Sequence, residues 1–216
     1  VIRLHYIELD EPKIDIPKGD INYLLEAMEA QWELSGLTYN FSVVQTLQKI
    51  LKKGGRKVTV AIFEGSEILS VWPGYHDSIF GVSLDVGSTT VAACLSDLSS
   101  GDVITSVNTM NPQIRFGEDL MSRVSFAMMN FNGVHQMTES IRGAINELLH
   151  ELTEESNVPL NSILEISIVA NPVMHHILLG IDPCELGGAP FSLAIDTSVS
   201  EAAVNFGLNI NPGGKV

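Results

Sequence analysis

The order of strands and helices in the second half of the chain limits the folds that it can adopt. Three apolar segments, separated by short turns, predict a meander of three strands, and they cover residues 81–86, 91–95 and 103–109. Two helices are expected next, over 118–130 and over 134–156, where apolar residues recur along one face. Residues 163–170 then predict a buried strand that returns to the sheet after the long helix.

A short helix follows this fourth strand. Asn171 suits its N-cap, Pro172 its first position and Gly180 the residue after its end. When the two helices before the fourth strand are counted as one helical connection, the predicted order is β-β-β-α-β-α, a mixed sheet in an α/β (α+β) fold.

The first 78 residues predict a separate small α/β unit. An edge strand is expected in the first ten residues, followed by a helix over 21–34 with Asp20 as its N-cap. A second helix starts at the cap Asn40, and Gly54 suits the position just after its end. Residues 58–63 and 68–71 predict a hairpin. The turn-rich stretch 72–77 places a domain boundary near residue 78, giving parts 1–78 and 79–216.

The composition excludes several classes of protein. Hydrophobic residues make up 45% and charged residues 18%, which is typical of a folded chain. A net charge of −14 argues against a general nucleic-acid binder, which needs a basic face. No apolar stretch of about 18 residues predicts a membrane span, and no secretion signal is visible.

The two cysteines, Cys94 and Cys184, exclude a disulfide scaffold, a Cys-rich zinc site and a Cys₄ iron–sulfur cluster within this chain. Reduced thiols favour a cytoplasmic location. His175 and His176 are adjacent, so on a helix they cannot chelate one metal ion and we expect structural roles. Methionines in and around the predicted helices are more typical of core filling than of a binding surface, and they are Met110, Met121, Met128, Met129 and Met137.

The turn between the first two strands of the meander carries the strongest chemical signal. Its sequence, residues 85–90, is Asp-Val-Gly-Ser-Thr-Thr. Gly87 lets the backbone approach an anion closely, and the amides and hydroxyls of residues 88–90 could donate hydrogen bonds to phosphate. Asp85 would repel phosphate directly, so its expected role is to hold water on a bridging Mg²⁺. The alternative is that this segment is only a favourable turn between strands.

With the strand and helix order added, this turn resembles the first phosphate motif of the ribonuclease H-like superfamily of ATPases that includes acetate and sugar kinases, heat-shock-70 and actin. Two longer segments resemble a narrower family, the reductive activators of corrinoid proteins. Residues 111–123 (NPQIRFGEDLMSR) resemble its N-P-Q-x-x-x-G-x-D-[LV]-x-S-R segment, and residues 170–180 (ANPVMHHILLG) resemble its [GA]-N-x-x-M-x-H-x-L-L-G segment. The first 78 residues resemble its linker and small middle domain.

The resemblance implies an ATP-dependent activator that returns a corrinoid protein of a methyltransferase system from Co(II) to Co(I). It implies that ATP and Mg²⁺ bind at Asp85, Gly87, Ser88, Thr89 and Thr90, and that electrons come from a [2Fe–2S] ferredoxin-type domain. Gln113 could face the nucleotide cleft or the partner protein. Asn171 could line the cleft or be a helix cap. Asp119 could also face the cleft or the partner protein, or it could form an i,i+4 pair with Arg123. No residue is assigned as a catalytic group.

The sequence departs from the full family pattern. The clustered cysteines are missing, Ser88 stands where threonine is commoner, and no second phosphate motif follows. We therefore expect an internal part of a longer protein, with residues 79–216 as the first lobe of the ATPase domain. Alone, it should neither hydrolyse ATP nor carry an iron–sulfur cluster.

Two other functions stay open at this point. One is a small-molecule kinase of the same superfamily, and the other is a non-enzymic actin-like interaction module. A single ATPase lobe would expose apolar surface, which is compatible with self-association as a homodimer.

Overall fold

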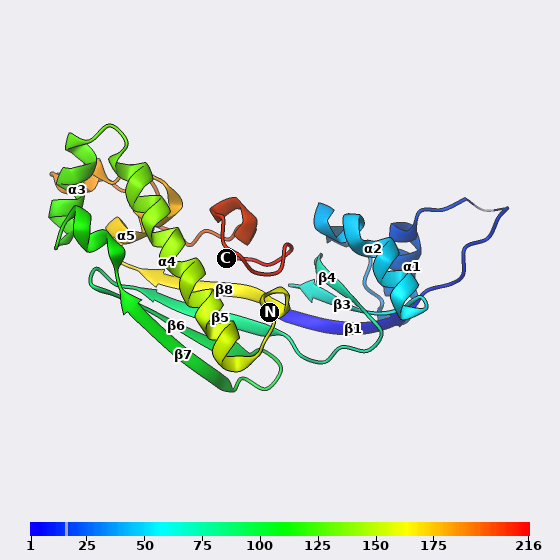
Figure 1. Cartoon of the computed structure of the whole chain (residues 1–216). Coiled ribbons are helices and arrows are strands. Elements are labelled where there is room, and N and C mark those ends of the chain that lie inside the picture. The colour runs from blue at the N-terminus through cyan, green and yellow to red at the C-terminus, as the bar shows by residue number, and fades with distance from the viewer. Residues whose placement is uncertain (16) are drawn as a thin grey trace. The chain divides into compact units, whose positions relative to one another are not determined.

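The computed structural model describes residues 1–15 and 17–216 (Figure 1). The chain divides into two compact units. The first contains Val1–Ser78 and Asn211–Gly214, and the second contains Ile79–Ile210 and Lys215–Val216. Each unit has its own core of buried apolar side chains. The assignment of the two parts to named domains stays a prediction.

The first unit is a four-stranded sheet with two helices. Its strands are β1 (Ile2–Glu8), β2 (Thr38–Tyr39), β3 (Lys57–Phe63) and β4 (Glu67–Pro73), in the order β1-β3-β4-β2. Among the described strands β1 lies at the edge of the sheet beside β3, so the predicted edge strand is confirmed, as is the β3–β4 hairpin. The helices are α1 (Asp20–Trp32) and α2 (Phe41–Gly54).

The ends of these helices differ in part from the prediction. Asn40 caps α2, because its side chain accepts a hydrogen bond from the Ser42 N–H at 3.0 Å. Asp20 does not cap α1: Gly19 holds the cap position, and the Asp20 carboxylate forms an ion pair with Arg56 at 3.1 Å. The left-handed residue after α2 is Gly55 (φ 58°) and not the predicted Gly54, which is the last residue of the helix.

The second unit is built on a mixed sheet in the order β7-β6-β5-β8. Its strands are β5 (Phe80–Val86), β6 (Thr90–Asp97), β7 (Val103–Met110) and β8 (Ile163–Ala170). The meander β5–β6–β7 is antiparallel, and β8 returns parallel to β5. This confirms the predicted mixed sheet and its actin-like order.

The α-helices of this unit are α3 (Leu120–Met129), α4 (Gly133–Ser156) and α5 (Pro172–Leu179). Short 3₁₀ helices are η1 (Pro112–Phe116), η2 (Leu160–Ser162), η3 (Cys184–Gly187) and η4 (Ala203–Phe206). None of the helices in the described ranges is long and apolar enough to cross a membrane.

Helix α4 lies across one face of the mixed sheet (Figure 1). Its buried residues, among them Ile141, Ile145 and Leu148, share a core with Val82 and Leu84 of β5. Because side chains alternate along a strand, Ser83 and Asp85 project from the opposite face, where both are exposed. The position of Asp85 on the open face therefore follows from the burial of its neighbours.

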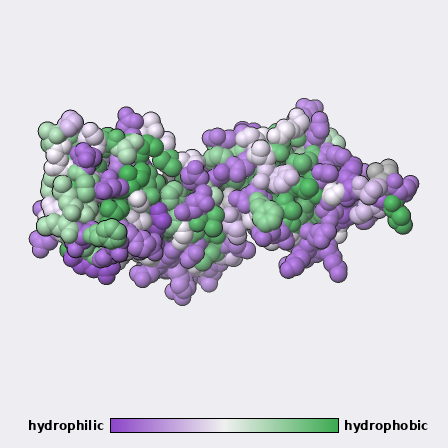
Figure 2. All heavy atoms as spheres, turned by 90° about the horizontal axis from the view of Figure 1, so that it is seen from above, coloured by the Kyte–Doolittle hydropathy of each residue, from purple (hydrophilic) through white to green (hydrophobic). Residues whose placement is uncertain are grey.

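The predicted core position of the five methionines is wrong for most of them. Met137 is fully buried, but Met110, Met121, Met128 and Met129 are between 49% and 78% exposed. Figure 2 shows apolar residues scattered among polar ones on the visible face. Core filling is therefore right for one of the five and wrong for four.

Candidate functional site

The turn between β5 and β6 is narrow and depends on glycine. The N–H of Gly87 donates to the carbonyl oxygen of Thr90 at 3.0 Å. A Cβ atom on Gly87 would lie only 2.8 Å from that oxygen, too close for any side chain without a backbone shift. Gly87 and Ser88 are half-buried, whereas Thr89 and Thr90 are exposed.

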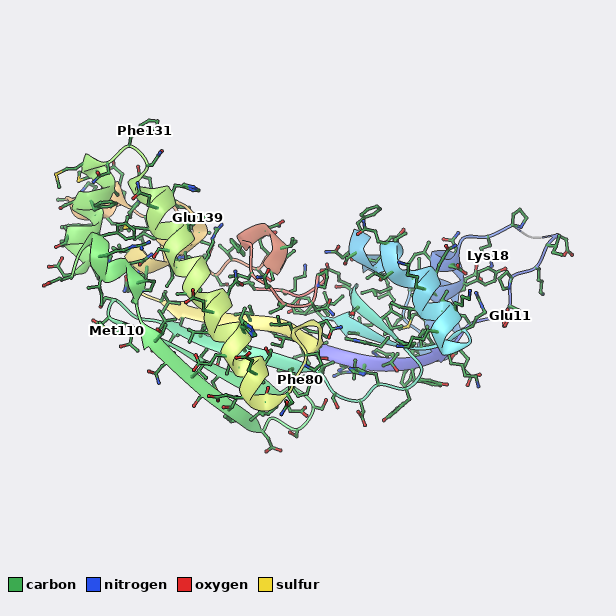
Figure 3. The ribbon with its side chains drawn as sticks, in the orientation of Figure 1. Glu11, Lys18, Phe80, Met110, Phe131 and Glu139 are labelled. Carbon is green, nitrogen blue, oxygen red and sulfur yellow. The ribbon has the colours of Figure 1, made fainter. Side chains whose placement is uncertain are left out.

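The carbonyl groups of the turn are held by protein donors. Asn111 uses its side-chain Nδ2 to donate to the Gly87 oxygen and its backbone N–H to donate to the Thr89 oxygen, both at 2.7 Å. The guanidinium of Arg123 donates to the Ser88 oxygen. The turn lies beside the end of β7, where Met110, labelled in Figure 3, pairs with Thr90.

This arrangement determines where the amide groups of the turn point. In a trans peptide the C=O of one residue and the N–H of the next point in opposite directions. The amides of Ser88 and Thr89 therefore point away from Asn111 and Arg123. In the part of the chain that the structure describes, neither amide has a hydrogen-bond acceptor. Two unpaired amides beside three hydroxyls form an arrangement suited to an anion.

Gln113 lies behind the turn and is fully buried. Its Nε2 donates to the carbonyl oxygen of Met137 at 2.8 Å, and its Oε1 accepts from Arg123 at 3.4 Å. Its side chain thus presents no surface that a nucleotide could contact in this structure. Its direct contact with a cofactor stays a prediction that this placement does not support.

Arg123 contacts the turn, although the sequence indicated it only as an ion-pair partner of Asp119. The structure shows instead that Asp119 caps α3, accepting from the Ser122 N–H at 2.7 Å. The Arg123 guanidinium is fully buried and reaches Ser88, the Gly117 oxygen at 3.1 Å and the Met174 sulfur at 3.0 Å. The sequence feature that could have indicated this buried arginine is its place inside a mostly apolar helical stretch.

Burial lowers the pKa of the Arg123 guanidinium, and the nearby Asp119 carboxylate opposes this shift. Hydrogen bonds from Ser122 lower the pKa of the Asp119 carboxyl.

Asn171 caps α5, accepting a hydrogen bond from the Met174 N–H at 3.0 Å. Its proposed contact with nucleotide stays a prediction. His176 is buried and structural: its Nε2 accepts from the Ala194 N–H at 3.1 Å, so its Nδ1 carries the proton and donates to the Pro172 oxygen at 2.8 Å. A core role for this histidine is therefore confirmed.

The residues present fit a nucleotide-bound Mg²⁺ ion but not a [2Fe–2S] cluster. The described part of the chain holds no group of three or more His, Cys, Asp or Glu arranged for a metal ion. A nucleotide-bound Mg²⁺ does not need one, because it keeps several waters and takes one or two carboxylates besides phosphate oxygens. The exposed Asp85 carboxylate beside the turn fits that requirement. A [2Fe–2S] cluster does not fit two cysteines that are 90 residues apart.

Comparison with known proteins assigns the chain to a family. Residues 1–78 match the family model for the RACo linker region, and residues 80–216 match the model for the RACo middle region. The chain belongs to the RACo family of reductive activators of corrinoid proteins. It is 27% identical over 181 residues to a protein named corrinoid activation enzyme RamQ, from Eubacterium limosum. That match covers 83% of this chain and 30% of RamQ.

A solved structure of this kind has the same fold. The structure of a reductive activator for corrinoid, iron–sulfur protein covers 99% of this chain with a TM-score of 0.83 and 28% identity. The chain covers 35% of that protein. The chain thus spans about a third of the length of both relatives.

Proposed function

We propose that this chain is the nucleotide-phosphate-binding part of an ATP-dependent activator that returns a corrinoid protein from Co(II) to Co(I). The observation that carries the proposal is the turn at residues 87–90, whose carbonyls are bonded inward and whose Ser88 and Thr89 amides are unpaired in the described structure. Family membership supports the corrinoid target, because both relatives are named for corrinoid activation.

In this proposal the turn binds the phosphates of ATP. The Ser88 and Thr89 amides and the hydroxyls of residues 88–90 donate to phosphate oxygens. Asp85 orients water on the Mg²⁺ ion, which, when bound, neutralises negative charge on the phosphates. Gln113 acts on the site indirectly, by bonding the Met137 carbonyl and the Arg123 guanidinium. Asn171 acts indirectly by capping α5. Residues 79–216 thus supply one lobe of the ATPase domain, and residues 1–78 supply the linker and a small domain.

The electron comes from outside this chain in this proposal. A [2Fe–2S] ferredoxin-type domain of the same protein supplies it, and ATP hydrolysis drives the transfer to cobalt. The partner is a corrinoid protein of a methyltransferase system in the cytoplasm. Because a nucleotide held between two lobes loses contacts and water exclusion when one is missing, residues 1–216 alone should not hydrolyse ATP.

The test uses the intact protein with a purified corrinoid protein in the Co(II) state and a low-potential reductant. The absorption spectrum of the corrinoid distinguishes Co(II) from Co(I). We expect Co(I) to form with Mg–ATP, and not with a non-hydrolysable analogue. Equal reduction with and without ATP would overturn the proposal. Phosphorylation of a sugar or carboxylate without corrinoid reduction would assign the kinase function instead.

A further inference from the structure

Arg123 is a buried cation without a buried anion. Its side chain is fully buried, and no ion pair joins it to a carboxylate anywhere in residues 1–15 and 17–216. Burying an arginine costs free energy unless its donors find acceptors. The acceptors here belong to separate segments of the chain and include two main-chain carbonyls, those of Ser88 and Gly117.

The contact with Ser88 has a consequence for the next residue. Because the Ser88–Thr89 peptide is planar and trans, a Ser88 carbonyl held inward leaves the Thr89 N–H pointing outward. Without the guanidinium, the carbonyl would be an unpaired acceptor and the peptide would be free to rotate. Asn111 holds the neighbouring Gly87 and Thr89 carbonyls with a neutral amide and a backbone N–H, whereas Arg123 supplies a charged donor to the Ser88 carbonyl.

We propose that Arg123 is a positioning residue for nucleotide phosphate: by holding the Ser88 carbonyl, it aims the Thr89 amide at the bound phosphate. This rests on the proposed function. Its charge, placed behind the turn, also adds attraction for a polyphosphate. The role needs a guanidinium, because its planar set of five donors can reach Ser88, Gly117 and Gln113 together, whereas a lysine ammonium is a compact point charge.

Three variants of the intact protein separate positioning from stability. Arg123→Met removes the donors and the charge, and Arg123→Lys keeps the charge. The matched control is Arg142→Met, because Arg142 on α4 also donates to a main-chain carbonyl, that of Leu178, through Nε at 3.0 Å and a second nitrogen at 2.9 Å. Arg142 makes no hydrogen bond to the turn.

The measurements are the dissociation constants for Mg–ATP and for adenosine, with the melting temperature of each variant. We expect Arg123→Met to weaken Mg–ATP binding by about tenfold or more, the effect of losing one hydrogen bond to a charged group, and to leave adenosine binding unchanged. Arg123→Lys should lie between it and the wild type. Arg142→Met should lose thermal stability and keep its affinity for Mg–ATP.

Unchanged Mg–ATP affinity in Arg123→Met would overturn the positioning role, and so would an equal loss of ATP and adenosine binding. If Arg123→Met does not fold, Arg123→Lys carries the same comparison. A wild-type protein that does not bind Mg–ATP would overturn the proposed function, and this role with it.

Discussion

Two residues, Asn111 through its side chain and its backbone N–H and Arg123 through its guanidinium, determine how the peptide groups of the turn at residues 87–90 are oriented. Their hydrogen bonds to three successive carbonyls turn the amides of Ser88 and Thr89 outward. Both residues lie in the segment 111–123, which the sequence analysis singled out by resemblance. In the structure, this segment supplies the hydrogen-bond donors that hold the carbonyl groups of the turn.

The sequence indicated the turn itself but not its support. Gly87 and the hydroxyls of residues 88–90 are recognisable because they are adjacent. Arg123 lies 35 positions from Ser88, and no local spacing could predict that contact. The rule for i,i+4 pairs pointed to Asp119 instead, whose carboxylate is used as a helix cap.

At Asp85 we expect a magnesium-specific defect. In the intact protein, Asp85→Asn removes the charge that holds water on Mg²⁺, so the dissociation constant for Mg–ATP should rise roughly tenfold. The constant for ATP in EDTA should not rise, because no cation is then present. Calorimetric titration with and without Mg²⁺ measures both constants.

Asp102→Asn is the control, since Asp102 is an exposed carboxylate in the turn between β6 and β7. An equal loss of affinity with and without Mg²⁺ would contradict the role assigned to Asp85.

At the scale of single elements, the helix ends connect the sequence to the site. Asn171 and Asp119 start α5 and α3, the two helices that carry Met174 and Arg123. Cap residues are among the better predicted features, as Asn40 and Asn171 show, because an N-cap uses only contacts within three residues. Asp20 fails as a cap because a distant residue, Arg56, binds its carboxylate.

We expect Asn171 to act as a cap. Asn171→Ala should lower the free energy of unfolding by about 1 kcal/mol, the usual cost of losing an N-cap. Asn171→Ser keeps a capping oxygen and should restore most of that loss, with wild-type affinity for Mg–ATP. Urea unfolding and ATP titration give the two quantities. A stable Asn171→Ser variant with weakened ATP binding would show instead that Asn171 contacts the nucleotide.

The cap of α3 should contribute to acid sensitivity. Hydrogen bonds from Ser122 lower the pKa of Asp119, so the folded state holds the proton less tightly than the unfolded state. This stabilisation is present above the ordinary carboxyl pKa and is lost as the pH falls through the lowered pKa. Asp119→Asn keeps a capping oxygen without a titrating group.

The melting temperature measured against pH should therefore fall less steeply below pH 4 in Asp119→Asn than in the wild type, given an ordinary Asp pKa of about 3.9. Identical acid limbs in the two proteins would contradict this assignment.

At the scale of the whole molecule, the order of elements was predictable and the surface was not. Apolar runs and helical spacing identify β5 to β8, α4 and α5, because burial imposes those periods. The same spacing could not show that Met121, Met128 and Met129 are exposed, because the packing of a helix against its neighbours is not a local property. The long helix predicted a fourth strand that returns to the sheet, and the structure shows that β8 pairs with β5 in parallel.

Separate cores predict separate responses to core mutations. Leu24 is fully buried in the core of the first unit, and Leu24→Ala should destabilise that unit by about 2–5 kcal/mol. Amide hydrogen exchange should rise within residues 1–78 and stay unchanged in β5 to β8, and Mg–ATP affinity should be retained. Faster exchange in the turn at 87–90 would contradict this.

The most direct test of the phosphate-binding turn is the dissociation constant of Mg–ATP in the Gly87→Ala variant of the intact protein. An alanine Cβ would lie 2.8 Å from the Thr90 oxygen, so the turn must change shape. The control is Gly143→Ala on α4, where a Cβ meets no atom within 4 Å. We predict that Gly87→Ala binds Mg–ATP at least about tenfold more weakly, with Gly143→Ala unchanged. Wild-type affinity in Gly87→Ala would contradict the account.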